Sequence, residues 1–223
     1  MFEPHIRPNR LEDKYLKDMM ASPVVKGKIL LYGDSDFTRW QPLYGNTSVE
    51  ELIRMKDGSQ AIVNHGFGTS TAEELLYYYP MLVRPWEPRA LVLKAYGNDT
   101  DVGYCPEEIV ALLARVCEYA RTDFPGIRLF VCGSKPLVCD KTAKASAKWS
   151  AKEYDRLAKF YCESHDDATY VDLRAYAPFY TEGGAGNIDC LRDDLYLKDN
   201  VHFNEEGYKI FRTFMTDLLK DLL

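Results

Sequence analysis

Short apolar segments alternate with amphipathic helical patterns along nearly the whole chain. Each apolar segment is rich in Val, Ile, Leu or aromatic residues, as buried parallel strands are. Strand–helix alternation of this kind predicts a parallel sheet with helices on both faces. We therefore expect a three-layer α/β/α domain with a flavodoxin-like, five-stranded parallel sheet in the order 2-1-3-4-5. The expected strands are Lys28–Tyr32, Gln60–Asn64, Ala90–Ala95, Arg128–Cys132 and Thr169–Leu173.

Helix-start signals lie between these segments. Capping boxes at Thr71–Glu74 and Ser150–Glu153 each predict a helix start, and so does the proline at Pro106. Asn204 precedes the pattern of the last helix, whose expected buried side carries Tyr208, Phe211, Phe214, Met215 and Leu218.

Length and composition fit an ordinary globular protein. The 223 residues match a single α/β domain spanning 1–223, and the polar, charged start predicts an N-terminal arm over residues 1–26 that packs on it. The net charge of −6 argues against a nucleic-acid or anionic-membrane partner. No apolar run is long enough for a membrane span. With four histidines and no metal-ligand spacing, we expect neither metal nor cofactor.

The compartment is predicted from the cysteines and the start of the chain. None of the six cysteines forms a CxxC pair, and several lie in apolar contexts, which favours a reducing environment. The first residues lack the layout of a signal peptide, so we expect a cytoplasmic protein. A secreted protein whose leader had been removed would show the same start. The oligomeric state is left open.

Two distant segments carry the residue types of serine-hydrolase chemistry. Gly33-Asp34-Ser35 places a hydroxyl at the carboxyl end of the first strand, where α/β sheets keep their ligand crevices. Near the other end, Asp199 and His202 are three residues apart. A serine needs a base to become a nucleophile, and a carboxylate can orient that base. Asp199 and His202 could otherwise be polar turn residues, but together with Ser35 they favour a catalytic interpretation.

Acyl transfer also needs hydrogen-bond donors for the developing oxyanion. Candidates are the Ser35 N–H, the Gly68 N–H and the Asn98 side-chain amide, which follow the first three strands. Taken alone, Gly68 reads better as a turn glycine that needs positive φ, and Asn98 as turn chemistry. In the order 2-1-3-4-5, however, all three loops meet at one sheet edge.

These blocks resemble the SGNH hydrolases of the GDSL esterase/lipase family. Gly33-Asp34-Ser35, Gly68, Asn98-Asp99 and Asp199–His202 follow the family's order and span the chain from about residue 28. The resemblance implies metal-free ester hydrolysis through an acyl-enzyme. It also implies Ser35 as nucleophile, Gly68 and Asn98 as oxyanion donors, and Asp199 and His202 as the rest of the triad.

The chain departs from that pattern at two places. Asp36 follows the serine where the family often has leucine, and Tyr96-Gly97 precedes Asn98 where the family usually has Gly-x. Further residues have open roles. Arg39 and Lys135 could border the substrate, Trp40 is expected rather to pack a helix onto the sheet, and His65 is an unlikely base.

The sequence therefore predicts a serine esterase that acts on a small-molecule ester. We favour short acyl groups, such as acetyl, on a polar or carbohydrate alcohol, because the chain is acidic and has no evident long apolar lid. A lysophospholipase or thioesterase is the alternative enzyme. A catalytically silent binding domain on the same fold is the alternative from another class.

Overall fold

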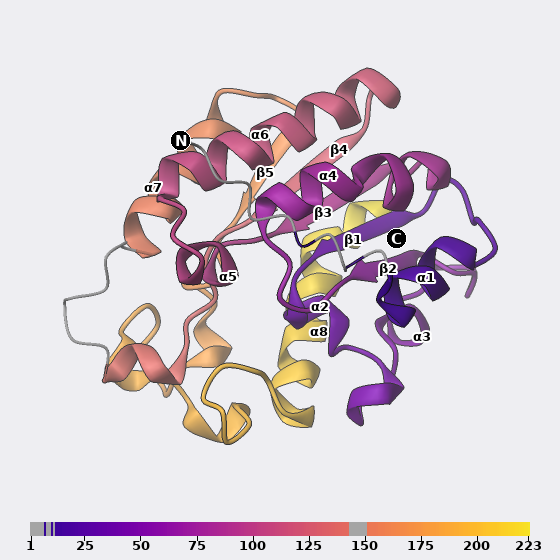
Figure 1. The fold of residues 1–223 in the computed structure, drawn as a ribbon. Helices are drawn as coiled ribbons and strands as arrows, with labels where there is room; N and C mark the ends of the chain where they lie inside the picture. Colours follow the sequence, from indigo (N-terminus) through magenta and orange to yellow (C-terminus); the bar gives the residue numbers. More distant parts are fainter. Residues whose placement is uncertain (1–6, 8–9, 11, 143–150) are drawn as a thin grey trace.

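A five-stranded parallel sheet forms the middle layer of the molecule (Figure 1). The computed structural model describes residues 7, 10, 12–142 and 151–223. The strand order is β2-β1-β3-β4-β5, which confirms the α/β architecture and the order predicted from the sequence. The strands are β1 (Ile29–Gly33), β2 (Ile62–Gly66), β3 (Ala90–Lys94), β4 (Arg128–Cys132) and β5 (Ala168–Val171).

The predicted strand bounds differ from these mainly at β2, which lies two residues later than expected. Its last residues, His65 and Gly66, are not typical strand formers, yet they pair with Tyr32 and Gly33 of β1. Pairing with a central strand therefore overrides the local composition.

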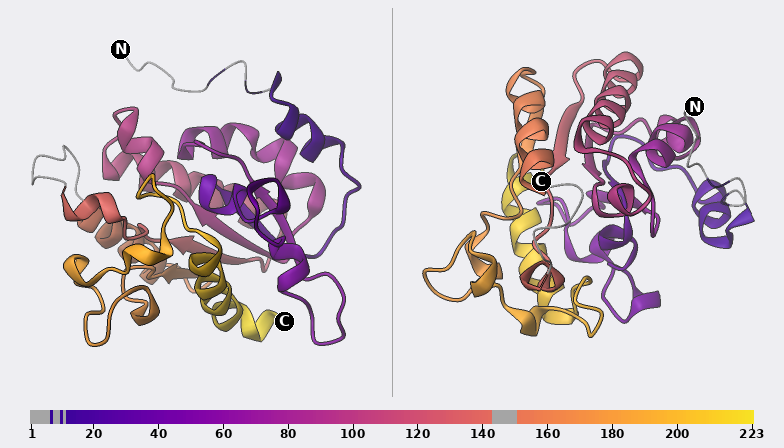
Figure 2. Two further views of the ribbon diagram at one scale, coloured as in Figure 1. Left: turned by 90° about the horizontal axis from the view of Figure 1, so that it is seen from below. Right: turned by 60° about the vertical axis from the view of Figure 1, so that its left-hand side comes forward.

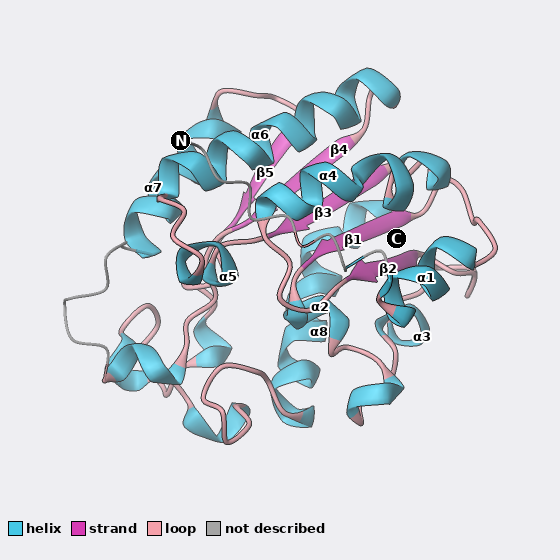
Figure 3. Ribbon diagram, viewed as in Figure 1, coloured by secondary structure: helices cyan, strands magenta, loops and turns pink. Residues whose placement is uncertain are grey.

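Helices cover both faces of the sheet, as Figures 2 and 3 show. On one face, Leu30, Tyr32 and Leu91 pack with the side chains of three helices and of the N-terminal helix. On the other face, alternate strand residues such as Ile29 and Leu31 pack against a second set. The first set is α4 (Ala72–Leu82), α6 (Pro106–Asp123), α7 (Ala151–Glu163) and α1 (Lys14–Ala21); the second is α2 (Ser35–Thr38), α3 (Val49–Leu52) and α8 (Glu205–Leu219).

The helix starts agree with the sequence signals where they can be compared. The Thr71 hydroxyl accepts the Glu74 N–H at the start of α4, but the Glu74 carboxylate bonds elsewhere, so only half of that capping box forms. Asn204 caps α8 by accepting the Gly207 N–H. The capping box expected at residues 150–153 begins outside the described residues.

The last helix anchors its face of the sheet. Tyr208, Phe211, Met215 and Leu219 are buried at spacings of three and four, so they form one stripe. Leu219 takes the inner position where the sequence suggested Leu218, and Leu218 and Phe214 pack at the margin of the core. Burying each large apolar side chain contributes about 1.5–3 kcal/mol, so this stripe fixes α8 firmly.

The loops at the carboxyl edge of the sheet gather the chemistry. The segments after β1, β2 and β3 lead into α2, α4 and α5 (Gly97–Asp101), and all three strands point the same way. A long segment, residues 172–204, with only short 3₁₀ turns between β5 and α8, lies on the same side of the sheet (Figure 1).

Candidate functional site

Ser35 begins the short helix that follows the central strand β1. Gly33 ends that strand beside β3, so closely that a Cβ there would lie 2.5 Å from the Lys94 carbonyl oxygen. Asp34 caps the helix by accepting the Asp36 N–H at 3.0 Å. The tight strand–cap–helix turn therefore places the Ser35 side chain, half-buried, at the sheet edge.

Ser35, His202 and Asp199 form one hydrogen-bonded chain. His202 Nε2 lies 2.9 Å from Ser35 Oγ, and His202 Nδ1 lies 2.8 Å from Asp199 Oδ2. The other oxygen of Asp199 accepts the N–H groups of Val201 at 3.0 Å and His202 at 2.9 Å. The turn thus fixes the position of the Asp199 carboxylate. The carboxylate in turn orients the His202 ring so that Nε2 faces the Ser35 hydroxyl.

Asp199 carries its negative charge across the working pH range of most enzymes. Partial burial would raise the pKa of Asp199, but hydrogen bonds from the backbone and ring of His202 and from Val201 lower it to about 2. Arg39 Nη1, 3.9 Å from Asp199 Oδ2, adds a positive charge nearby. The carboxylate that orients the His202 ring is therefore ionised.

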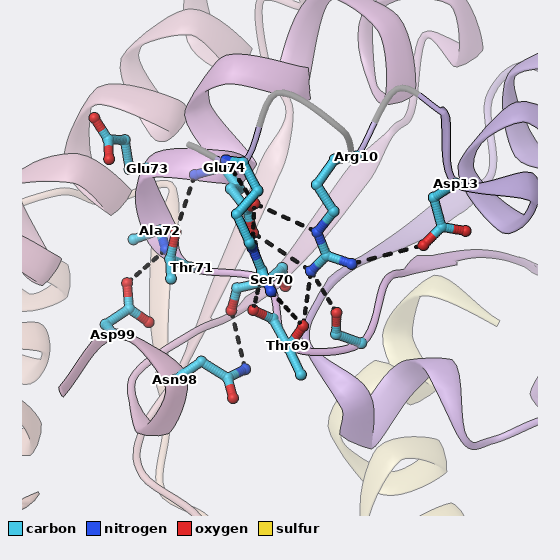
Figure 4. A network of polar contacts seen from close by, with 12 residues as sticks. Arg10, Asp13, Thr69, Ser70, Thr71, Ala72, Glu73, Glu74, Asn98 and Asp99 are labelled. Atoms are coloured by element: carbon cyan, nitrogen blue, oxygen red, sulfur yellow. Dashed lines mark hydrogen bonds and ion pairs between the residues drawn. The ribbon is translucent and has the colours of Figure 1, made fainter. Parts of the chain in front are cut away.

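The structure brings the proposed oxyanion donors to the same edge. The Asn98 side-chain amide donates one hydrogen to the Ser70 carbonyl at 3.0 Å and has a second hydrogen to offer (Figure 4). Within the described residues, the N–H groups of Ser35 and Gly68 have no hydrogen-bond acceptor. The interpretation of Gly68 as a positive-φ turn glycine is wrong, because the positive φ, 59°, belongs to Thr69.

Asp99 ties together the two loops that carry these donors. Its carboxylate accepts the Ala72 N–H at 2.6 Å and the Tyr96 N–H at 3.0 Å. The side chain is buried, and this burial raises the pKa of Asp99 to about 7 despite the two backbone hydrogen bonds. Tyr96 has a φ of 139°, so one of these bonds holds a residue in an unfavourable conformation next to Asn98.

The two residues that flank Ser35, Asp34 and Asp36, belong to a buried group of two carboxylates and two lysines. Lys94 Nζ is 3.0 Å from Asp34 Oδ2 and 2.9 Å from Asp36 Oδ2. Lys135 bonds the other oxygen of Asp36 and donates to the Val201 carbonyl at 2.8 Å. Lys135 therefore links the residue after Ser35 to the residue before His202.

The charges in this group compensate one another. Burial disfavours a charged Asp36, but the Lys135 and Lys94 ammonium groups hold its pKa well below its usual value. Burial also disfavours a charged Lys94, whereas Asp34 and Asp36 raise its pKa above the usual value. The negative charge of Asp36, which departs from the family pattern, is thus balanced by two lysines. Lys94 ends β3, and Lys135 lies in the loop after β4.

Other residues named from the sequence lie away from the reacting atoms. Trp40 is fully buried and stacks on Phe211 at 5.1 Å between ring centres. It therefore packs the segment after α2 against α8, where the sequence suggested packing of a helix onto the sheet. The His65 ring is buried, its Nδ1 lies 2.6 Å from the Leu82 carbonyl oxygen, and burial lowers its pKa to about 4. Such a ring makes a poor candidate for the base.

Sequence reasoning missed Lys94 and the contacts of two arginines in the N-terminal segment. Lys94 had a visible signal, because it is the one charged residue in the apolar segment Ala90–Ala95. A buried charge needs a partner, and Asp36 after the serine was the matching signal. Arg7 and Arg10, which bond the loop of Gly68, had no such signal. An arginine that only faces solvent would have the same sequence context.

Comparison with known families agrees with this geometry. The model of the GDSL-like lipase/acylhydrolase family matches residues 31–210, which include every block described above. The chain belongs to the GDSL-like lipase/acylhydrolase family. No curated protein matches the sequence.

Several solved structures share the fold at low sequence identity. A proposed acylhydrolase from Bacteroides fragilis is 17% identical, with a TM-score of 0.72 and coverage of 98% of this chain and 100% of that one. A GDSL-like lipase from Bacteroides thetaiotaomicron is 17% identical, with a TM-score of 0.70 and coverages of 94% and 97%. A variant of an acetyl-xylooligosaccharide esterase from Geobacillus stearmophilus is 17% identical, with a TM-score of 0.64 and coverages of 87% and 94%.

The described part of the chain contains no helix with the length and apolarity needed to cross a bilayer. In the same residues, no three His, Cys, Asp or Glu side chains gather as a metal site would require.

Proposed function

We propose that this GDSL-family protein is a serine esterase that works through an acyl-enzyme. The observation that carries the proposal is the chain of hydrogen bonds from Ser35 through His202 to Asp199, at 2.9 and 2.8 Å. These distances are within the range that a nucleophile, a base and an orienting acid require.

In the proposed reaction, His202 Nε2 removes the Ser35 proton as Oγ attacks the ester carbonyl. The oxyanion accepts hydrogen bonds from the Gly68 N–H, the Ser35 N–H and the free hydrogen of the Asn98 amide. The ring then returns the proton to the leaving alcohol, which leaves an acyl group on Ser35. Water, activated by the same ring, releases the acid and regenerates the serine.

The substrate we favour is a short acyl ester, such as acetyl, of a polar or carbohydrate alcohol. A pocket of about 120 Å³ shares Arg39 with the surroundings of Asp199, although none of Ser35, Asp199 and His202 lines it. Its lining is mixed, with the polar side chains of Arg39, Asn46 and Glu205 and the apolar or aromatic ones of Tyr44, Leu197 and Phe203. Its volume is well below the several hundred Å³ of a site for a drug-sized ligand, so it suits a small group. The likeness to an acetyl-xylooligosaccharide esterase supports the same class.

The test combines a substrate series with active-site labelling. We expect p-nitrophenyl acetate and acetylated xylo-oligosaccharides to be hydrolysed faster than long-chain p-nitrophenyl esters, acyl-CoA or lysophospholipid. A fluorophosphonate should label the wild-type protein at Ser35, and Ser35→Ala should lose both labelling and turnover while keeping its fold. A preference for acyl-CoA or lysophospholipid would show that the substrate is a thioester or a lysophospholipid instead of a short acyl ester of a polar alcohol. A folded wild-type protein that neither labels nor hydrolyses any ester would favour a silent binding domain.

A further inference from the structure

Three consecutive carbonyl groups of the loop after β2 each accept a hydrogen bond from a side chain. Arg10 Nη2 donates to the Gly68 carbonyl at 2.6 Å, and Arg7 Nη2 donates to the Thr69 carbonyl at 2.6 Å. The third donor is Asn98, to the Ser70 carbonyl at 3.0 Å. Two of the three donors therefore come from the N-terminal segment, about sixty residues earlier in the chain. Figure 4 shows Arg10 next to Thr69.

The loop that they hold is conformationally unfavourable. The Ser70 N–H donates to the Phe67 carbonyl at 3.2 Å, which closes a four-residue turn with Gly68 and Thr69 in the middle. Thr69, the third residue, has a φ of 59°. Turns with positive φ at this position favour glycine or asparagine, and a β-branched residue there is a genuine outlier. Turning the Gly68–Thr69 peptide over would return Thr69 to negative φ.

The arginine contacts fall on this residue and its neighbours. The Thr69 hydroxyl accepts from Arg7 Nη1 at 3.0 Å and from Arg10 Nη2 at 2.9 Å. Arg10 also lies over the Phe67 ring, with its guanidinium carbon 5.6 Å from the ring centre.

A buried carboxylate holds the arginines in place. The fully buried Glu74 side chain accepts Arg7 Nε at 3.0 Å and Nη2 at 2.7 Å, and Arg10 Nε at 3.4 Å. A two-point contact of this kind fixes the guanidinium plane and therefore the direction of its remaining donors. This is why Glu74 does not complete the capping box with Thr71.

We propose that Arg7 and Arg10 are positioning residues, which hold the Phe67–Ser70 turn in the orientation that presents the Gly68 N–H to the reacting carbonyl. The inference deepens the proposed esterase function and rests on it. When the arginines are absent, the Gly68–Thr69 peptide turns over, Thr69 returns to negative φ, and the Gly68 carbonyl leaves its partner. The Gly68 N–H belongs to the preceding Phe67–Gly68 peptide, so it is displaced only by the shift of the released turn as a whole, and that shift takes it away from the oxyanion.

Arg10→Met is the first test, because Arg7 still pairs with Glu74 in that variant. We expect kcat for p-nitrophenyl acetate to fall by about 10- to 100-fold with little change in KM, since the donor acts mainly in the transition state. Lys17→Met is the matched control: this lysine lies on the same segment and pairs with Glu12, away from the turn, so it should leave kcat unchanged.

Thr69→Gly separates positioning from a general structural role. Glycine adopts positive φ at no steric cost, so the turn should keep its orientation without help. In the Thr69→Gly background, Arg10→Met should therefore cost much less kcat than in the wild-type background, as a double-mutant cycle would measure. A merely structural arginine would lower the unfolding midpoint equally in both backgrounds and would not be rescued.

The outcomes are distinguishable. An active wild-type enzyme whose kcat is unchanged in Arg10→Met, or whose loss is equal with and without Thr69→Gly, would overturn the inference and leave the esterase function standing. A wild-type protein without labelling or turnover would overturn the function first. If Arg10→Met does not fold, Arg10→Lys provides the same comparison, because one ammonium group cannot reproduce the fork of bonds to Gly68 and Thr69.

Discussion

At the scale of single residues, Lys135 has an unusual position, because it contacts the chain neighbours of both Ser35 and His202. It bonds Asp36, the residue after Ser35, and the carbonyl of Val201, the residue before His202. The sequence suggested that it could border the substrate or end the strand. The structure gives it instead a buried place beneath the site, 7% exposed.

Lys135→Met should lower kcat by roughly 10- to 100-fold, because small displacements of a base cost rate steeply. Asp36 would keep Lys94 as its partner, so we expect the fold to survive. Lys159→Met, on the surface of α7, removes the same charge and should be silent. Esterase kinetics beside thermal unfolding would check this. Unchanged kcat in a folded Lys135→Met protein would show that the Asp199–His202 turn holds itself in place.

At the scale of elements, the turn after β2 has a glycine, Gly68, that neither close packing nor a positive φ requires. A Cβ added at Gly68 would meet no atom closer than the Thr38 hydroxyl at 4.0 Å, and its φ is not positive. Gly66, two residues earlier, differs, since a Cβ there would lie 2.4 Å from Cβ of Phe37. Packing therefore requires a glycine at position 66 but not at position 68.

Gly68→Ala and Gly68→Pro together test the oxyanion role of the N–H. Alanine keeps the N–H and should keep most of the activity. Proline suits the second position of a turn but removes the N–H, so kcat should fall by about 10²–10³, as for loss of one oxyanion donor. Circular dichroism and unfolding midpoints would verify that both variants fold. Equal activity in the two variants would exclude Gly68 as a donor.

At the scale of the whole molecule, the layered fold followed from the alternation of strands and helices, and the order of strands from the topology that such alternation favours. The bounds of β4 were predicted residue for residue, because an apolar run between polar neighbours marks a central strand. The edge strand β2 was displaced, because pairing carried it through His65 and Gly66.

The candidate site was predictable only as far as its residues form local blocks. Ser35 and the Asp199–His202 pair were identified from short motifs, and the structure places them within hydrogen-bond distance. Contacts that join distant segments through ordinary residue types had no such pattern. The ion pair of Lys94 with Asp36 and the bonds of Arg10 to the turn are examples, since only tertiary packing brings these groups together.

Stability should depend on pH through Asp99. The pKa of this buried carboxyl is about 7 in the folded protein and 3.8 for the free side chain, so between these values the folded state binds a proton that the unfolded chain has released. The free energy of unfolding should therefore fall as pH rises from about 4 to about 7 and change little from this group above that. Urea unfolding across this range, compared with Asp99→Asn, would measure it. A constant difference between the two proteins would contradict the shift.

The hydrogen bond between Ser35 and His202 joins residues 167 positions apart. Closing so long a loop is among the last events that a folding chain completes, and Trp40 reaches its stacked place on Phe211 only when α8 has docked. We therefore expect a chain still emerging from the ribosome to lack the contact between Ser35 and His202 until residues 199–202 and α8 have been made. Any esterase activity that depends on this contact should appear only late in synthesis, and chains cut short before it should be inactive.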